Sequence, residues 1–250
     1  MTRYLLRIEY DGGPFFGWQR QNDVDTVQGM IEIALKKIQG EAVTLFGAGR
    51  TDAGVHATGQ AAHIDLRDDF PARKVADALN YHLRPDPIAV LSAEIVPDDF
   101  HARFDATERR YRYIIENRRA DLTLDYGRAW RVAQTLDHEA MQRAAQALIG
   151  EHDFTTFRDV QCQSKSPVKT LDEINVYRFG SRLELTFRAR SFLHRQVRSI
   201  TGSLVDVGRG VQPESWIADI LAAKDRKACG PVAPCDGLYL EDVIYERLKG

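Results

Sequence analysis

The chain has 250 residues, a formal net charge of −2, 44% hydrophobic residues and 28% charged residues. This is the composition of an ordinary globular protein and excludes a disordered or fibrous chain. No apolar run reaches the roughly 18–20 residues of a membrane-spanning helix, and residues 1–11 lack the apolar core of a secretory signal. The three cysteines, Cys162, Cys229 and Cys235, form no CxxC pair. We therefore expect a cytoplasmic protein with reduced thiols and without a disulfide framework, a structural zinc site or a membrane partner.

Arginine is concentrated in two segments although the net charge is slightly acidic. Residues 103–119 contain six arginines against three acidic residues, and residues 188–209 contain five arginines against one acidic residue. A protein that is close to neutral can still carry a basic surface for nucleic acid. The alternative is that these arginines form scattered ion pairs on the surface, and composition alone leaves both interpretations open.

The first hundred residues alternate between helix-like and strand-like patterns. Asp25 has the position of a helix N-cap, with Gln28 three residues later in a capping-box arrangement. Apolar residues at helical spacing follow as far as Ile38, and a second helix is predicted over residues 72–83. Strands are predicted over residues 4–10, 43–46, 61–66 and 88–95.

The rest of the chain shows the same alternation. Asp137 is expected to cap a helix, and a further helix is predicted over residues 192–207. Strands are predicted over residues 110–116, 168–179, 182–190 and 238–245, the middle two forming a hairpin about Gly180. We therefore predict an α+β protein with two domains, residues 1–100 and residues 101–250.

The stretch from Gly47 to Ala57, GAGRTDAGVHA, is the most informative part of the sequence. It fits neither the phosphate loop GxxxxGK[ST] nor the dinucleotide fingerprint, whose GxGxxG opens a helix. Its glycines permit a tight loop that presents Asp52 beside Arg50. A neighbouring guanidinium favours the ionised carboxylate, which can act as a nucleophile or a base. The alternative is an aspartate that stabilises a tight turn.

The same stretch resembles the signature of the tRNA pseudouridine synthase A family. The resemblance continues in order along nearly the whole chain, from Arg7 to Tyr245. Its further segments are YDGGPFFGWQRQ, TVQGMIEIAL, ALNYHLRPD, FHARFDATERRYRYII, SFLHRQVRSITGSLVDVGRG and GLYLEDVIY.

The resemblance implies roles for four residues. Asp52 matches the catalytic aspartate of the family, and Tyr111, in RRYRYII, matches the aromatic residue that stacks on the target base. Arg198, in HRQVRSITG, matches the basic residue that pairs with the aspartate. Arg50 resembles a residue implicated in RNA contact and base extrusion. From their patterns alone, Tyr111 would be an ordinary aromatic residue of a strand and Arg198 a solvated arginine of a helix.

The resemblance also implies a fold, a substrate and an assembly. The expected fold is the α+β pseudouridine synthase fold, with two similar ferredoxin-like halves, a mixed, mainly antiparallel sheet and an active site in a central cleft. The expected reaction converts uridine to pseudouridine at positions 38–40, in the anticodon stem-loop of tRNA. The expected assembly is a homodimer that contacts one tRNA with both protomers.

This reaction breaks the bond between uracil N1 and ribose C1′, turns the base and joins C5 to C1′. It exchanges no electrons with an outside partner, so we expect no cofactor and no metal. His56, His63 and His101 lack metal-ligand spacing and are expected to be surface or hydrogen-bonded histidines.

Two other functional classes remain open. A non-catalytic RNA-binding module would use the arginine-rich strands without needing Asp52. A hydrolase would use Asp52 as its nucleophile, but a retaining glycosidase needs a second carboxylic acid about 5–5.5 Å away. The sequence beside the loop offers no such acid.

Overall fold

A computed structural model gives the fold and describes residues 1–67 and 69–248. The chain divides into two compact units. Unit 1 consists of Met1–Thr107 and Tyr239–Gly250, and unit 2 consists of Glu108–Leu238. The predicted single boundary at residue 100 differs from this division, because the last strand of the chain pairs within unit 1.

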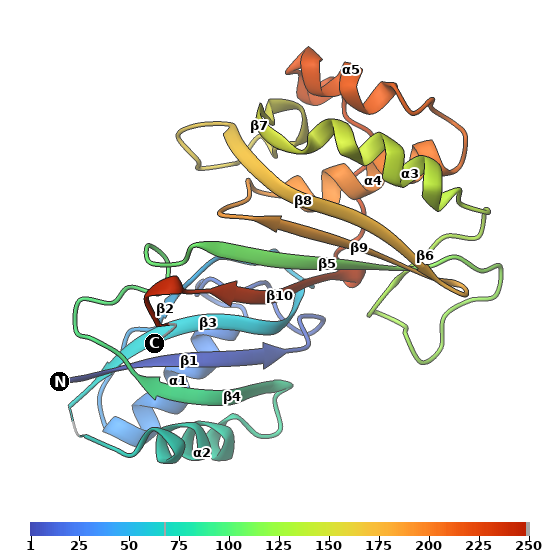
Figure 1. The fold of residues 1–250 in the computed structure, drawn as a ribbon. Coiled ribbons are helices and arrows are strands. Elements are labelled where there is room, and N and C mark those ends of the chain that lie inside the picture. The colour runs from blue at the N-terminus through green and yellow to red at the C-terminus, as the bar shows by residue number, and fades with distance from the viewer. Residues whose placement is uncertain (68, 249–250) are drawn as a thin grey trace. The chain divides into compact units, whose positions relative to one another are not determined.

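Unit 1 is built on a twisted sheet in which β1 is central (Figure 1). Strand β1 (Thr2–Tyr10) pairs in antiparallel fashion with β3 (His56–Leu66) on one side and with β4 (Ile88–Ile95) on the other. The other edge of β3 receives two short partners, namely β2 (Phe46–Gly47) in antiparallel and β10 (Leu238–Ile244) in parallel orientation. The order β4-β1-β3-β2 is that of a ferredoxin-like unit.

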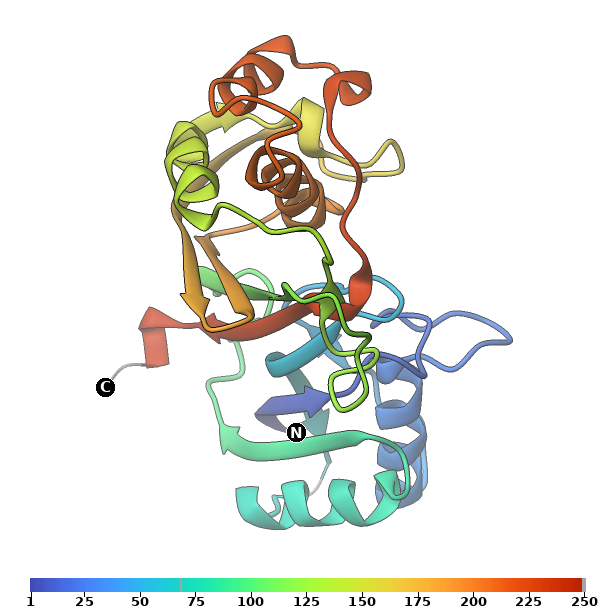
Figure 2. The same cartoon turned by 90° about the vertical axis from the view of Figure 1, so that its right-hand side faces the viewer.

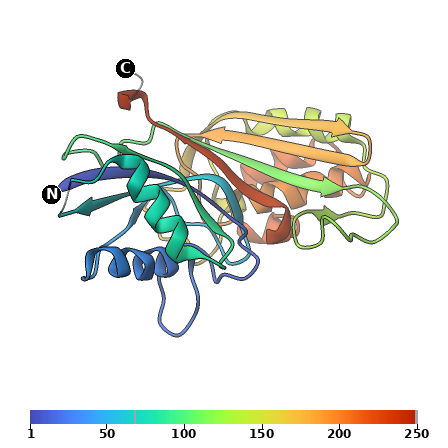
Figure 3. The ribbon, with the colours of Figure 1, turned by 90° about the horizontal axis from the view of Figure 1, so that it is seen from below.

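Two helices cover the core of unit 1. Helices α1 (Val27–Gln39) and α2 (Ala72–Leu83) contact one another at a steep angle (Figure 3), and α2 also runs along β4 (Figure 2). Their apolar faces bury Ile31, Leu35, Leu79 and Leu83. Because each helix has helical apolar spacing, its buried apolar stripe packs into the core of unit 1. Glu32 of α1 is a charged residue that is also buried, at 8% exposed.

Unit 2 repeats the succession strand, helix, hairpin and helix. Strand β5 (Glu108–Glu116) pairs with β9 (Arg182–Ala189), β9 with β8 (Val168–Phe179), and β8 with β7 (Gly150–Asp153), all in antiparallel fashion. The two-residue strand β6 (Trp130–Arg131) runs parallel to β5. Leu183, Leu185 and Phe187 alternate along β9 and are fully or almost fully buried.

The helices of unit 2 are α3 (His138–Ala145), α4 (Gln196–Gly208) and α5 (Trp216–Ala223). Helix α3 packs against α4 and β8, and α5 packs against α3 (Figure 1). Short 3-10 helices cover Gln146–Leu148, Thr155–Phe157, Arg226–Ala228 and Cys235–Gly237, and in unit 1 Glu246–Leu248. No helix within the described ranges is long and apolar enough to cross a bilayer. The predicted α+β fold with mixed, mainly antiparallel strands is confirmed.

Two predicted helix starts were wrong. Thr26, not Asp25, is the N-cap of α1, because its backbone is extended and its side chain accepts a hydrogen bond from Gly29 N. This places Gln28 one position too early for a capping box. Helix α4 begins at Gln196 rather than at Phe192, since Arg195 has a φ of 59°. A left-handed residue interrupts the helical hydrogen-bond ladder.

The strand predicted over residues 43–46 is reduced to Phe46 and Gly47. Phe46 lies opposite His63 and Gly47 opposite Ala62 of β3, and Ala48 N, just after the strand, donates to Ala61 O (2.8 Å). Strand β3 itself begins at His56, five residues before its predicted start at Ala61, because its first two residues pair with β10. Strand pairing, rather than local alternation, sets both limits.

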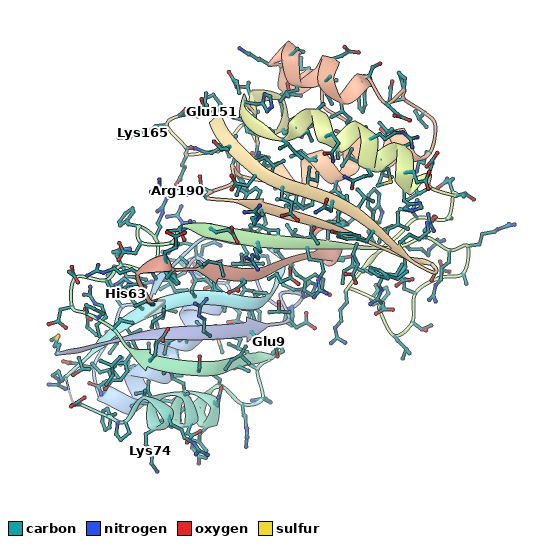
Figure 4. The ribbon with its side chains drawn as sticks, viewed as in Figure 1. Glu9, His63, Lys74, Glu151, Lys165 and Arg190 are labelled. Carbon is teal, nitrogen blue, oxygen red and sulfur yellow. The ribbon has the colours of Figure 1, made fainter. Side chains whose placement is uncertain are left out.

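A pH-dependent stability is predicted from His63, which lies on β3 (Figure 4) and is 2% exposed. Burial, reinforced by nearby positive charge from His101 and Arg3, lowers the pKa of His63 to about 4. An unfolded chain binds this proton near pH 6.5, so it holds more protons than the folded chain between pH 6.5 and 4. The free energy of unfolding should therefore fall by up to about 3 kcal/mol as the pH drops through this window.

Urea denaturation of the wild type and of His63→Phe at pH 7 and pH 4 measures this contribution. The loss of stability on acidification should be smaller in His63→Phe. Equal losses in the two proteins would show that His63 does not carry the effect.

Candidate active site at the Asp52 loop

The loop between β2 and β3 carries Asp52, which is half-buried. Thr51, just before it, is 7% exposed. Val55 N donates a hydrogen bond to Asp52 O (3.1 Å), which closes a turn immediately after the aspartate. The carboxylate thus stands at the start of a tight turn that leads into β3.

The segment that follows β1 holds this loop on both sides of Asp52. Trp18 N donates to Thr51 O (3.1 Å), and Gly54 N donates to Phe15 O (3.2 Å). The hydroxyl of Thr51 also hydrogen-bonds the buried hydroxyl of Tyr10 (2.8 Å). Since these bonds flank Asp52 directly, its backbone is held in one place by partners more than thirty residues away in the sequence.

Two glycines let these segments approach closely. A Cβ on Gly12 would lie 2.0 Å from Val55 O, and one on Gly17 would lie 2.7 Å from Thr51 O. Gly17 also has a φ of +88°, which residues with side chains rarely adopt. The backbone contact that supports the Asp52 loop therefore requires glycine at both positions.

Arg50 is exposed, and its direction is set by a chain of amides. Its Nε donates to Gln19 Oε1 (3.0 Å), and Gln19 Nε2 donates to Gln28 Oε1 (2.7 Å) on α1. Gln28 is 6% exposed and donates in turn to Glu32 and to Leu45 O. Because Gln28 is anchored in the core, Gln19 can orient the guanidinium of Arg50.

Tyr111 lies on β5 in unit 2 and is half-buried. Its ring meets Phe192 edge-on, with centroids 5.0 Å apart and an interplanar angle of 84°. Two residues further along β5, Tyr113 is fully buried and its hydroxyl donates to Pro234 O (2.8 Å). Burial raises the pKa of Tyr113 well above its ordinary value of 10. Tyr113 is thus a core residue, whereas Tyr111 keeps part of its ring at the surface.

Arg198 lies in the first turn of α4 and is half-buried. Its Nε donates to Ala233 O (2.8 Å), and its backbone oxygen accepts from Ala233 N (3.1 Å). The preceding Arg195 contacts Asp159 (2.9 Å) through an ion pair. Arg198 is therefore docked on a neighbouring backbone segment, in contrast to the solvated helix arginine that its pattern alone suggested.

The four predicted site residues thus lie in two places, two of them in unit 1 and two in unit 2. Asp52 and Arg50 share one loop in unit 1. Tyr111 and Arg198 belong to β5 and α4 of unit 2, where the positive charge of Arg198 acts on Tyr113. Across the described ranges, no group of His, Cys, Asp or Glu is placed to hold a metal ion. His56 Nδ1 accepts a hydrogen bond from Gly12 N (3.0 Å), so this histidine belongs to the support of the loop.

Residue patterns did not single out the residues that support the loop. Gly12, Gly17 and Trp18 lie in the segment DGGPFFGW, and Gln19 follows it. The signal was the density of glycine and aromatic residues in a loop, which is unusual unless another backbone packs closely against it. The sequence could suggest a close approach, but not that the partner would be the Asp52 loop.

Comparisons with known proteins identify the family of the chain. The family model described as "tRNA pseudouridine synthase" matches residues 7–105 and 144–246. The tRNA pseudouridine synthase A of Hyphomonas neptunium is 61% identical over 98% of this chain and 99% of that protein. The tRNA pseudouridine synthase A of Maricaulis maris is 59% identical over 98% of this chain and 98% of that protein. The protein of the same name from Rhodopseudomonas palustris strain HaA2 is 59% identical over 98% of this chain and 100% of that protein. The chain therefore belongs to the tRNA pseudouridine synthase family.

Proposed function

We propose that this protein isomerises uridine to pseudouridine at positions 38–40, in the anticodon stem-loop of tRNA, with Asp52 as the catalytic residue. The observation that carries the proposal is the Asp52 loop, whose backbone is bonded on both sides of the aspartate. Rigid placement of a reactive group is what an enzyme needs and what a binding module does not need. The family membership of the chain supports the same reaction class.

The reaction is an internal rearrangement. The N1–C1′ bond breaks, the uracil turns, C5 bonds to C1′, and C5 loses its proton while N1 gains one. Atoms and electrons balance within the substrate and water, so the proposed reaction needs no cofactor. Asp52 would act either as a nucleophile towards the substrate or as a base that removes a ribose proton.

The other three residues are assigned to holding the substrate. Arg198 is proposed to pair with the Asp52 carboxylate, and Tyr111 to stack on the uracil. Extruding a base from its helix costs a few kcal/mol, and stacking on an aromatic ring offsets ~1–3 kcal/mol of this cost. Arg50, oriented through Gln19, is proposed to contact the RNA beside the extruded base.

The proposal extends to the assembly and the setting. We infer that the protein acts in the cytoplasm as a homodimer, with one tRNA contacting both protomers. Light scattering of the protein alone measures the number of protomers in the assembly, and light scattering with tRNA measures the number of tRNA molecules bound to it.

Tritium release tests the activity. An unmodified tRNA transcript with tritium at C5 of its uridines should lose tritium to water in the presence of the protein. Transcripts in which U38, U39 and U40 are replaced one at a time by cytidine then locate the targets. Release that persists when all three are replaced would overturn the positional assignment but leave the isomerase intact. No release from a transcript that the protein binds would overturn the reaction itself.

Tyr111 provides a prediction that separates stacking from proton transfer. Tyr111→Phe keeps the ring and should bind tRNA within about twofold of the wild type, whereas Tyr111→Ala should bind ~5- to 100-fold more weakly. If the hydroxyl assists removal of the C5 proton, Tyr111→Phe should also lower kcat, by ~10²-fold or more. Single-turnover tritium release at saturating enzyme measures this step. Wild-type binding by Tyr111→Ala would contradict the stacking role.

A further inference from the structure

A group of aromatic rings lies at the surface of unit 1, towards the end of β3 that is remote from His56. We call it the aromatic patch and define it by Phe46, His63, His101, Arg103 and Phe104. Phe46 is 43% exposed and Phe104 is 68% exposed. Phe46 and Phe104 therefore place apolar ring surface next to water, and a contiguous exposed apolar area can mark an interaction site.

The rings of the patch are arranged around His101. Its centroid lies 4.4 Å from that of Phe104, 4.7 Å from that of His63 and 5.9 Å from that of Phe46. Phe46 stacks on His63 at 4.9 Å, with the two planes only 12° apart. The guanidinium carbon of Arg103 lies 5.9 Å from the centre of the Phe104 ring. The patch therefore presents ring faces together with a cation.

A tight turn fixes the exposed part of the patch. His101 N donates to Asp105 Oδ2 (2.8 Å), Phe104 N donates to His101 O (3.1 Å), and Arg103 N donates to His101 Nδ1 (3.1 Å). Ala102 N, in the same turn, donates to His63 Nδ1 (3.1 Å), which ties the turn to β3. Phe104 is thus displayed by a rigid scaffold, so little conformational freedom is lost when a partner binds.

The patch combines exposed flat rings with the positive charge of Arg103. Burial lowers the pKa of His101, as it does that of His63, so both imidazoles are neutral at pH 7. The acidic residues at this end of unit 1 include Asp65, Asp98, Asp99 and Asp105. Asp65 contacts Arg3 at 2.7 Å, and Asp99 and Asp105 contact Arg247, at 2.5 Å and 3.6 Å. Arg103 then supplies positive charge beside exposed rings, a combination that suits a stacked base with its phosphate.

The patch lies far along β3 from His56, the residue at which the chain enters this strand after Asp52. His63 lies seven residues along β3 from His56, where the Asp52 loop ends. At ~3.3 Å per residue this is roughly 23 Å. A nucleotide bound at the patch is therefore a different one from the uridine beside Asp52.

We propose that the aromatic patch is a second RNA-binding surface, on which an unpaired base of the tRNA stacks on Phe104 while Arg103 contacts its phosphate. The inference rests on the proposed action on tRNA. Unpaired bases in RNA loops can stack on aromatic side chains in this way, whereas bases inside a helix are already stacked on one another.

The test compares Phe104→Ala, Phe104→Trp and a matched control, Phe179→Ala. Phe179 is 61% exposed and lies in unit 2, at the end of β8. Filter binding of full-length tRNA gives Kd, tritium release gives kcat, and light scattering gives the oligomeric state. Phe104→Ala should bind tRNA ~5- to 100-fold more weakly than the wild type, with kcat unchanged at saturating tRNA. Phe104→Trp keeps an aromatic ring and should bind tRNA as the wild type does. Phe179→Ala should bind as the wild type.

The outcomes separate this inference from the proposed function. If the wild type releases tritium and Phe104→Ala binds tRNA as tightly as the wild type, the proposed stacking surface is overturned and the proposed function is not. Loss of the oligomer in Phe104→Ala would assign the patch to contact between copies of the chain and would also overturn the inference. An inactive wild type that still binds tRNA would overturn the proposed function, while the binding comparison would still decide whether the patch contacts RNA.

Discussion

Replacing Asp52 with asparagine is expected to lower the rate of tritium release by at least ~1,000-fold while tRNA affinity changes by less than about twofold. Asparagine has nearly the size of aspartate, so the hydrogen bonds of the loop backbone, Trp18 N to Thr51 O and Val55 N to Asp52 O, should persist. The neutral amide is neither a nucleophile nor a base of useful strength. Removing a group that acts in the chemical step typically costs two to six orders of magnitude in rate.

The matched control is Asp23→Asn. Asp23 also lies in unit 1 and is exposed, and its φ of 63° is one that asparagine tolerates well. Both variants lose one negative charge, so any general electrostatic effect on RNA binding appears in both. Tritium release under single-turnover conditions and filter binding at two salt concentrations measure the two properties.

The outcome for Asp52 decides among the functional classes. If Asp52→Asn no longer releases tritium but keeps its affinity for tRNA, the result is the one that an isomerase predicts. A wild type that binds tRNA but releases no tritium, together with an Asp52→Asn variant of equal affinity, would favour the non-catalytic RNA-binding module. Cleavage of the glycosidic bond without formation of pseudouridine, abolished by Asp52→Asn, would favour the hydrolase.

Helix α2 and strands β4 and β8 begin and end at their predicted residues. In α2 the apolar residues at helical spacing, Val75, Leu79 and Leu83, are the ones that are buried, so the local pattern there reports the true helix. Helix α4 shows the opposite case. Leu193 continues the apolar spacing of the helix and is buried. It nevertheless lies outside the helix, because the left-handed Arg195 stands between Leu193 and the first residue of α4.

The sequence motif GAGRTDAGVHA singled out the Asp52 loop as the candidate active site, whereas residue patterns did not identify the segment that supports this loop. Gly12 and Val55 are forty-three positions apart in the sequence, yet their backbones lie in close contact in the folded chain. Local patterns carry no information about which distant segment will lie against them. The same reason explains Gln28, which appeared to be a capping residue and is instead the buried anchor that orients Gln19.

Gly12→Ala is the second prediction with a large effect, and it tests whether the loop support matters for catalysis. The new Cβ would lie 2.0 Å from Val55 O, which belongs to the backbone and cannot rotate away. Forcing the two segments apart costs ~1–3 kcal/mol in typical overpacked sites, which corresponds to a fall in Tm of roughly 2–12 °C for a chain of this size. Displacing Asp52 by about 1 Å should lower kcat by ~100-fold.

Gly13→Ala is the control for Gly12→Ala because it makes the same change at the next residue. Its Cβ would meet only the side-chain oxygen of Asp11 at 3.2 Å, and this side chain can move. We therefore expect wild-type Tm and kcat for Gly13→Ala. Equal behaviour of the two variants would show that the close contact at Val55 is not needed. A Gly12→Ala variant that loses stability but keeps kcat would show that the contact holds the fold without positioning Asp52, because a loop that moved would carry the carboxylate with it.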